Sequence, residues 1–417
     1  MRILHICTLD SGGAGKAALR LHLGLKSIGV KSKMLVLHRS SSDNDVIEIE
    51  KKNNFFNRMW SEMNKRIISS EINTYNKPHV YFSTDRSISR LGKHILIQEA
   101  DIINLHWISR MVDYSEFFSK TKKKSIVWTL HDANPFTGGC HCFGDCTKYE
   151  TGCGACPGLR SEDSNDISRK IVERKKKAYQ WGNISVITPS RWLRNCAKKS
   201  YLLKESKIEV IPNGVPTSVF FKRNRQDSRG LLNLPQNKIL ILFGSHYRAE
   251  WKGFKQLVQS LELLAKRIDT DKIAFVIFGV NQSIDPVMKQ ALFSVYQLGQ
   301  IQEESLLSHV YSASDILVLP SLEENFPNVM LESMACGTPV VGFNTGGIPD
   351  AVIPNKTGLL AERGDVEDLA KKIEWMINHP KERQAMGENA RKLVEQEYNL
   401  QTHAKRYLKI YEKLLRP

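Results

Sequence analysis

The stretch LPSLEENFPNVMLESMACGTPVVGFNTGGIPD, residues 319–350, decides the fold of the second half of the chain. An apolar strand ends at Pro320, a polar loop follows, and a helix is predicted to begin near Asn328. Glu324 then lies in the loop, and Glu332 lies about one turn into the helix. Free amides at a helix N-terminus attract phosphate groups, and carboxylates accept hydrogen bonds from hydroxyl groups. This loop is therefore predicted to hold the diphosphate, ribose and sugar of a nucleotide-sugar.

Apolar strands alternate with helical segments, such as 14–28 and 253–267, along the whole chain. Near-continuous Ile, Val and Leu runs joined by helices predict parallel sheets covered on both faces, which is an α/β fold. The predicted strands are residues 3–7, 33–37, 102–105, 126–130, 184–188, 208–211, 239–243, 274–278, 316–319 and 339–342.

The turn IPNGVP, residues 211–216, interrupts this alternation near the middle of the chain. We interpret it as the link between two doubly wound, Rossmann-like domains that face a central cleft. The predicted domains are 1–211 and 212–397, and a C-terminal helix, 398–417, is expected to cross back to the first domain.

The composition is that of an ordinary globular protein, with 417 residues, 41% hydrophobic and 25% charged. It excludes a fibre, a disordered chain and a disulfide-packed miniprotein. The net charge of +16 is uneven, because residues 1–200 hold 33 basic and 19 acidic side chains, against 27 and 25 in the rest. An anionic partner of the first half is expected, and the candidates are a membrane surface, a phosphorylated substrate or nucleic acid. Neither a signal peptide nor a membrane-spanning run is evident, which predicts a cytoplasmic protein.

Residues 51–70 stand apart from the alternation. Their apolar residues recur near helical spacing between basic ones: Phe55, Phe56, Met59, Trp60, Met63, Ile67 and Ile68. This pattern is typical of a helix that lies on anionic lipid, and also of an amphipathic helix that packs on its own domain. The sequence leaves both interpretations open.

Six ordered motifs resemble the retaining GT-B glycosyltransferases of family 4. The stretch 324–341 is similar to the family's donor signature, in which two Glu eight positions apart precede Ala-Cys-Gly-x-Pro-Val-Val. The other matches are Gly12-Gly13-Ala14, TPSRW at 188–192, IPNG at 211–214, Lys252-Gly253 and NTGGIPD at 344–350. The resemblance implies a GT-B fold and a UDP- or GDP-sugar donor.

The resemblance also implies roles for individual residues. Glu332 would bind the ribose hydroxyls, Glu324 would contact the donor sugar, and Lys252 would neutralise the leaving diphosphate. Arg248 is expected beside Lys252, in place of a family Arg that falls near His246. The family has Gly at two positions where Asn and Pro stand here, so donor recognition is expected to differ. The donor-binding set is Gly12, Gly13, Arg248, Lys252, Glu324, Asn325, Phe326, Pro327, Asn328 and Glu332.

Two strand ends in the first half carry histidines. His106 follows a buried strand, and its position resembles that of the family His near the anomeric carbon of the donor. His131 and Asp132 follow the next strand and are expected to line the acceptor pocket, where the carboxylate would orient an acceptor hydroxyl. The predicted catalytic residues are His106, Lys252 and Glu324, with no catalytic metal.

Five of the eight cysteines lie within residues 140–156, in a glycine-rich insertion at 135–159. Cys140, Cys146, Cys153 and Cys156 fit a four-cysteine structural zinc site, with Cys142 and His141 as spare ligands. Disulfides and free thiols are the alternatives. A similar insertion occurs in some polysaccharide-assembly glycosyltransferases.

The sequence therefore predicts a retaining hexosyltransferase of bacterial surface polysaccharide synthesis, such as capsule or colanic acid. Its expected partners are a nucleotide-sugar, a glycan or lipid-linked glycan acceptor, and the anionic inner face of the cell membrane. One alternative is a nucleotide-sugar epimerase that uses the same cleft without an acceptor. Another is a basic nucleic-acid-binding protein, but the chain lacks the motif spacings of that class, and no nucleic-acid partner is expected.

Overall fold

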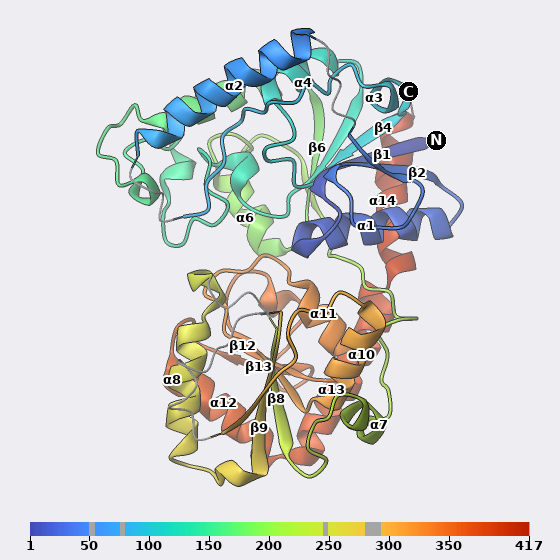
Figure 1. Cartoon of the computed structure of the whole chain (residues 1–417), viewed down its shortest axis with the longest axis vertical. Helices are drawn as coiled ribbons and strands as arrows, with labels where there is room; N and C mark the ends of the chain where they lie inside the picture. Colours follow the sequence, from blue (N-terminus) through green and yellow to red (C-terminus); the bar gives the residue numbers. More distant parts are fainter. Residues whose placement is uncertain (50–54, 76–79, 245–248, 280–292, 417) are drawn as a thin grey trace. The chain divides into compact units, whose positions relative to one another are not determined.

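The computed structural model describes residues 1–49, 55–75, 80–244, 249–279 and 293–416. The chain divides into two compact units (Figure 1). The first unit comprises Met1–Pro212 and His403–Pro417, and the second comprises Asn213–Thr402. The C-terminal residues thus belong to the same unit as the N-terminal half.

A parallel seven-stranded sheet forms the centre of the first unit, in the order β3-β2-β1-β4-β5-β6-β7. Its strands are β1 (Arg2–Leu9), β2 (Lys31–His38), β3 (Val46–Glu48), β4 (Ile102–Leu105), β5 (Ser125–Thr129), β6 (Asn183–Thr188) and β7 (Ile208–Val210). Its α-helices are α1 (Gly12–Ser27), α2 (Phe55–Asn73), α3 (Ile95–Glu99), α4 (Tyr114–Lys120), α5 (Ile167–Tyr179), α6 (Arg191–Lys199) and α14 (Leu400–Leu415). Strands β2 and β3 follow on one side of β1, and strands β4 to β7 follow on the other side. The order of the strands therefore reverses between β1 and β4.

The C-terminal helix α14 is part of the core of the first unit. It lies beside α1 in Figure 1, and Tyr407 and Tyr411 pack in one cluster with Leu21 of α1 and Ile102 of β4. The Tyr411 hydroxyl accepts a hydrogen bond from Asn104 Nδ2 at 2.7 Å. Burying aromatic and aliphatic side chains of this size stabilises a fold by about 1.5–3 kcal/mol each. The last helix therefore contributes to the core of the unit that holds the N-terminal half of the chain.

A parallel six-stranded sheet forms the second unit, in the order β10-β9-β8-β11-β12-β13. The strands are β8 (Ile239–Gly244), β9 (Ile273–Phe278), β10 (Ser294–Gln297), β11 (Ile316–Leu319), β12 (Val340–Phe343) and β13 (Gly358–Ala361). The α-helices are α7 (Arg225–Leu231), α8 (Phe254–Ala265), α10 (Glu304–Ala313), α11 (Asn328–Ala335), α12 (Val366–Asn378) and α13 (Pro380–Leu393). Separate apolar clusters occupy the two faces of this sheet, as expected for a doubly wound domain.

The prediction of two doubly wound α/β domains is confirmed, and all ten predicted strands are present. The sequence pattern missed β3, β10 and β13. Each of these strands lies at the edge of its sheet and has three or four residues. Such short edge strands lack the long apolar run that marks a central strand. Within the described residues, no helix has the length and apolar character needed to cross a membrane.

Candidate functional site

The predicted donor residues of the second unit lie where the strand order reverses. Strand β8 pairs with β9 on one side and with β11 on the other. The strand order therefore reverses between β8 and β11. Lys252 ends a short 3₁₀ turn (Glu250–Lys252) after β8, and Glu324 lies in the loop after β11. In open α/β sheets, ligands bind outside the carboxyl ends of the strands at this switch point.

Lys252 and Glu324 form an ion pair, with Nζ and Oε2 2.5 Å apart. Two glycines allow this approach. Gly253 has φ +68°, and a Cβ there would lie 1.7 Å from the carbonyl oxygen of Pro320. Gly346 has φ +56°, and a Cβ there would lie 1.7 Å from the carbonyl oxygen of Glu324. Only glycine meets both requirements, which gives a physical reason for Lys-Gly and Asn-Thr-Gly-Gly in the sequence.

Helix α11 follows this loop and begins at Asn328, as predicted. The preceding residue, Pro327, has no side chain that caps the helix, and Asn213 supports the turn by donating from Nδ2 to the carbonyl of Phe326 at 3.0 Å. A helix N-terminus in this position attracts an anionic group such as a diphosphate.

Glu332 lies inside α11 with 2% of its surface exposed. Its Oε2 accepts a hydrogen bond from the Tyr311 hydroxyl at 2.7 Å. Tyr311 belongs to α10 and is fully buried, so it orients the carboxylate. The second unit thus brings Lys252, Glu324, the start of α11 and Glu332 to one edge of its sheet. Arg248, like His246, lies outside the described residues.

The first unit presents its predicted residues at the equivalent edge. Gly12 and Gly13 begin α1 directly after β1, and His106 follows β4, on the other side of the switch point. His131 follows β5, the next strand. His106 has 2% exposure, and its two ring nitrogens lie 3.0 Å from ring nitrogens of His5 and His131. Both nitrogens of His106 are therefore engaged by other histidines.

Asp132 is also engaged within the first unit. Its Oδ2 lies 2.5 Å from Nδ1 of His141, and its Oδ1 accepts the amide of Asn134 at 2.9 Å. Burial favours the protonated form of Asp132. The charge of His141 and the hydrogen bond between the two side chains together outweigh the effect of burial, so the pKa of Asp132 is lowered. The His141 ring also packs on Tyr81 and Trp107, with ring centres 4.4 and 5.7 Å away. Asp132 thus belongs to a polar and aromatic cluster at the predicted acceptor edge.

The four cysteines predicted to bind zinc line one cavity of about 20 Å³, at residues Cys140, Cys146, Cys153 and Cys156. Burial raises the pKa of the Cys153 thiol to about 11. Within the described part of the chain, no three His, Cys, Asp or Glu side chains are arranged as a metal site. Zinc binding would therefore require these side chains to rearrange, and the zinc site stays a prediction.

A buried lysine that the sequence analysis missed fixes the start of the cysteine-rich segment. Lys175 of α5 is fully buried, and its ammonium donates to the carbonyls of Asn134 at 2.5 Å and Thr137 at 3.1 Å. Burial lowers the pKa of Lys175 to about 8. These hydrogen bonds from an ammonium group to carbonyl oxygens join segments that are about forty residues apart. No local sequence pattern predicts such a contact.

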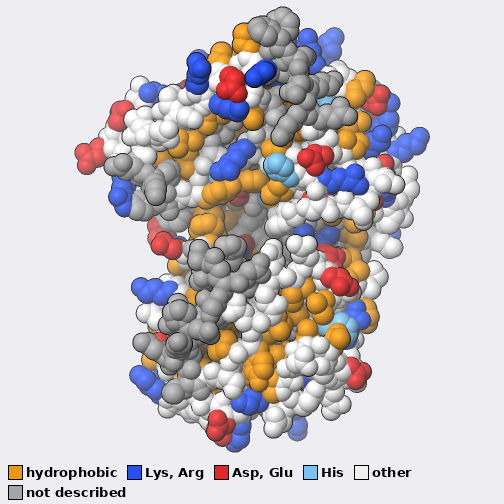
Figure 2. Space-filling model, viewed as in Figure 1, with side chains coloured by type: hydrophobic (Ala, Val, Ile, Leu, Met, Phe, Trp, Pro, Cys, Tyr) orange, Lys and Arg blue, Asp and Glu red, His pale blue; other side chains and the backbone are white. Residues whose placement is uncertain are grey.

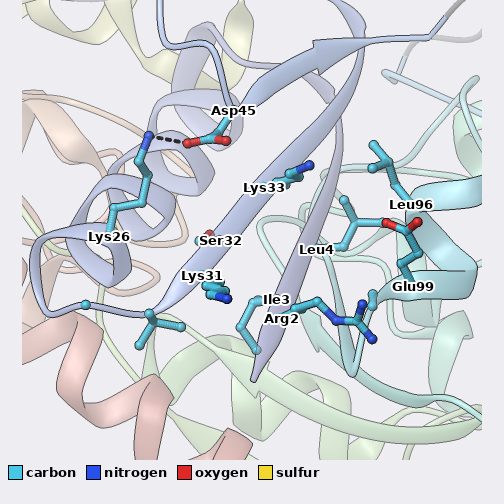
Figure 3. A pocket seen from close by; sticks show the side chains of 13 residues that line it. Arg2, Ile3, Leu4, Lys26, Lys31, Ser32, Lys33, Asp45, Leu96 and Glu99 are labelled. Atoms are coloured by element: carbon cyan, nitrogen blue, oxygen red, sulfur yellow. Dashed lines mark ion pairs between the residues drawn. The ribbon is translucent and has the colours of Figure 1, made fainter.

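A second cavity, of about 510 Å³, lies at the amino ends of β1 and β2, away from the predicted residues of the first unit (Figure 3). Leu4 and Leu96 contribute apolar walls, and Lys31 and Lys33 line it from β2. Lys26 also lines the cavity, but it is paired with Asp45 at 2.6 Å. The sequence analysis did not single out this cavity.

Comparison with known protein families shows to which families the chain belongs. Residues 11–219 match the family Glycosyltransferase Family 4, and residues 224–393 match the family Glycosyl transferases group 1. The first match alone spans 209 of the 417 residues. The chain therefore belongs to these glycosyltransferase families, and the resemblance inferred from the motifs is confirmed.

Relatives and solved structures agree with this family. CapM of Staphylococcus aureus, a capsular polysaccharide biosynthesis glycosyltransferase, is 28% identical over 256 residues, which is 58% of this chain and 65% of CapM. A D-inositol 3-phosphate glycosyltransferase of Arthrobacter sp. (strain FB24) is 31% identical over 189 residues, 44% of this chain and 45% of that protein. The matched stretches thus span about half to two thirds of these relatives.

Two solved structures cover nearly the whole chain. Sucrose-phosphate synthase of Thermosynechococcus elongatus has a TM-score of 0.68 at 20% identity, with 99% of both chains covered. Anabaena HepE in complex with UDP-glucose has a TM-score of 0.68 at 15% identity, with 99% of this chain and 100% of HepE covered. These likenesses show the fold, and the GT-B prediction is confirmed.

Proposed function

We propose that the chain is a retaining glycosyltransferase that moves a sugar from a UDP- or GDP-sugar to a glycan acceptor in bacterial surface polysaccharide synthesis. The observation that carries the proposal is the arrangement of Lys252, Glu324, the start of α11 and Glu332 at the switch point of the second sheet. A cation, a helix N-terminus and two carboxylates are the groups that a diphosphate and its two sugars require.

The ion pair between Lys252 and Glu324 is the basis for a separate proposed role of each residue when a donor binds. When a donor enters, its diphosphate competes for Lys252, and the sugar hydroxyls offer Glu324 new hydrogen-bond donors. Lys252 then stabilises the negative charge that develops on the diphosphate as the glycosidic bond breaks. The proposed reaction places this task on the protein's own cation and includes no catalytic metal.

The relatives support the type of donor and acceptor. HepE was solved in complex with UDP-glucose, and CapM is named for capsular polysaccharide biosynthesis. The excess of basic over acidic side chains in residues 1–200 suits an acceptor that carries a lipid diphosphate. We infer a lipid-linked glycan acceptor, met at the cytoplasmic face of the cell membrane.

Helix α2 is the proposed membrane contact. Trp60 and Asn64 face the domain, and the Arg90 guanidinium lies 5.0 Å from the Trp60 ring centre. Met59 and Met63, each one position before these residues, are 57% and 48% exposed. The side chains of Phe55 and Phe56 lie outside the described part. Figure 2 shows Lys and Arg side chains on the surface of the first unit, as contact with anionic lipid requires.

Nucleotide binding tests the proposal at the donor residues. Calorimetric titration with UDP, GDP, ADP and their common sugar conjugates is expected to give a measurable affinity for one base. Glu332→Gln keeps the side-chain volume and an acceptor for Tyr311 but loses the charge. Hydrogen bonds to charged groups contribute about 1.5–3 kcal/mol, so the affinity should fall about 10- to 100-fold. Glu362→Ala, at an exposed glutamate of the same unit, is the matched control and should bind as the wild type does.

Product analysis separates the proposed transferase from the alternatives. Incubation with the bound nucleotide-sugar and a lipid-linked glycan should give a product with the anomeric configuration of the donor. Conversion of the donor alone into its C2 epimer would instead establish an epimerase. No binding of any nucleotide by well-folded protein would refute the donor site itself.

A further inference from the structure

The cavity at the amino ends of β1 and β2 is lined by side chains that alternate along the two strands (Figure 3). In the parallel register, Lys31 of β2 lies beside Arg2 of β1, and Lys33 lies beside Leu4. Side chains two positions apart on a strand point to the same face of the sheet, and neighbouring strands lie about 4.8 Å apart. Two cations of β2 therefore lie next to one cation and one leucine of β1 on a single face of the sheet.

Two of the four cations among the described residues of the lining are neutralised by carboxylates. The Arg2 guanidinium lies 3.4 Å from Oδ1 of Asp101. The Lys26 ammonium lies 2.6 Å from Oδ2 of Asp45. These two pairs contribute no net charge to the cavity.

Lys31 and Lys33 are the cations of the cavity without such a partner. Both are exposed, and in the described part of the chain neither forms an ion pair. The remaining carboxylate of the described lining is Glu99, which lies beyond Leu4 as seen from Lys33 (Figure 3). Two ammonium groups thus stand against one carboxylate, and this local excess of positive charge favours an anionic ligand.

One wall of the cavity is apolar. Leu4 is 2% exposed and belongs to the core cluster on which Leu96 of α3 packs. Val30 and Ala100 extend the apolar lining. Ile95, which precedes Leu96 in α3, has 63% of its surface exposed. Because apolar surface is stabilised when a hydrocarbon group covers it, this wall favours a ligand with an apolar body beside its anionic group.

The rest of the lining does not suit a nucleotide or a sugar. None of the thirteen described residues that line the cavity is aromatic, so no ring is available to stack on a base or a sugar. The hydroxyl of Ser32 is buried and lies 2.8 Å from Nδ1 of His22. The volume of about 510 Å³ is in the range of small-molecule sites, about 300–1,000 Å³. The cavity therefore matches an anionic amphiphile of that size.

We propose that this cavity binds a lipid phosphate, with the phosphate on Lys31 and Lys33 and the hydrocarbon chain along Leu4 and Leu96. Charge-assisted hydrogen bonds from two ammonium groups suit a phosphate, which has several acceptor oxygens. Strands β1 and β2 have eight residues each, so at about 3.3 Å per residue the two edges of the sheet are about 25 Å apart. The site is thus separate from the predicted acceptor residues at the carboxyl edge, and it does not rest on the proposed function.

Titration calorimetry on the full chain tests both parts of the ligand. The probe is dihexanoyl phosphatidic acid, kept monomeric below its critical micelle concentration, and one molecule should bind per chain. Dihexanoyl phosphatidylcholine has the same chains without a net charge, and glycerol 3-phosphate has the phosphate without chains. Each should bind about tenfold more weakly or less. No binding of the phosphatidic acid, or equal binding of either comparison ligand, would overturn the proposal.

Exchange of the two lysines tests the place of binding. The double variant Lys31→Gln/Lys33→Gln changes exposed side chains, so the fold is expected to persist, and the affinity for dihexanoyl phosphatidic acid should fall about 10- to 100-fold. Lys123→Gln removes an exposed lysine of the same unit that does not line the cavity, and it should bind as the wild type does. An unchanged affinity of the double variant, or an equal loss in Lys123→Gln, would refute the site.

Hydrogen exchange locates the ligand on the wild-type protein without any substitution. Bound phosphatidic acid should slow exchange in peptides of α3 and of the start of β2. Slower exchange only in peptides that follow β4 and β5 would place the lipid at the carboxyl edge and overturn the proposal. UDP binding, measured on the same proteins, reports the proposed function separately and should be the same in the wild type and in the double variant.

Discussion

Replacement of His403 by phenylalanine should make the first unit less sensitive to acid. His403 lies on α14 with 2% exposure, and neither of its ring nitrogens has a hydrogen-bond partner. Burial, aided by the charge of Arg406 and by His131, lowers the pKa of His403 to about 3. Its ring packs edge-to-face on Tyr407 with centres 5.0 Å apart, a contact that phenylalanine keeps.

The magnitude follows from proton linkage. In the unfolded chain the pKa of a histidine is about 6.5. Between that value and about 3 the unfolded state binds a proton that the folded state does not, so the free energy of unfolding falls as the pH falls. From pH 7 to pH 5, His403 alone should remove about 2 kcal/mol, and His403→Phe should retain that amount. At pH 7 the variant should equal or exceed the wild type in stability, because no hydrogen bond is lost.

Hydrogen exchange followed by mass spectrometry measures this in peptides of β1, β4 and α14, which report the first unit alone. Tyr411→Phe is the matched control, because it removes a buried hydroxyl from the same helix. Burial raises the pKa of Tyr411 well above its ordinary value, so this control should change stability equally at both pH values. If His403→Phe and the wild type lose the same stability between pH 7 and pH 5, His403 does not titrate as a buried ring and the reasoning fails.

Three further changes test the second unit and the cysteine-rich segment. Gly346→Ala should abolish measurable UDP or GDP binding, because its Cβ would collide with the carbonyl of Glu324; titration calorimetry measures this. Asp315→Asn should lower the unfolding free energy of the second unit by about 3–5 kcal/mol, since Arg229, buried with it at 2.8 Å, would lose its partner; hydrogen exchange measures this. Purified protein should contain about one zinc per chain, and Cys153→Ser should lose it, by elemental analysis.

Each of these changes has a control in the same chain. Gly230→Ala places a Cβ in open space and should leave nucleotide binding intact. Asp271→Asn removes an exposed carboxylate of the second unit and should leave its stability within about 0.5 kcal/mol. Cys336→Ser lies in the other unit and should keep the zinc. Wild-type protein without zinc would show that the cysteines are not a metal site.

Local sequence determined the two doubly wound domains and where the predicted donor residues lie in the second one. Apolar runs joined by helical segments specify parallel strands wherever both faces are buried, so the central strands were predicted correctly. At positions 253 and 346 another segment of the backbone approaches so closely that there is no room for a side chain. Both positions must therefore be glycine, and the sequence analysis recognised them as parts of motifs. The membrane contact, the zinc and the retaining mechanism stay predictions.

Tertiary structure alone decided which side chains meet across the chain. Tyr311 reaches Glu332 from another helix, His5 reaches His106 across 101 positions, and Asn104 reaches Tyr411 across 307. No periodicity records such pairs, because each depends on strand order and helix packing, which bring distant residues together. The sequence marked His106 as the residue that meets the donor. The structure adds that both its ring nitrogens lie within hydrogen-bond distance of neighbouring histidines, because β1, β4 and β5 are adjacent parallel strands. The role of His106 at the donor stays a prediction.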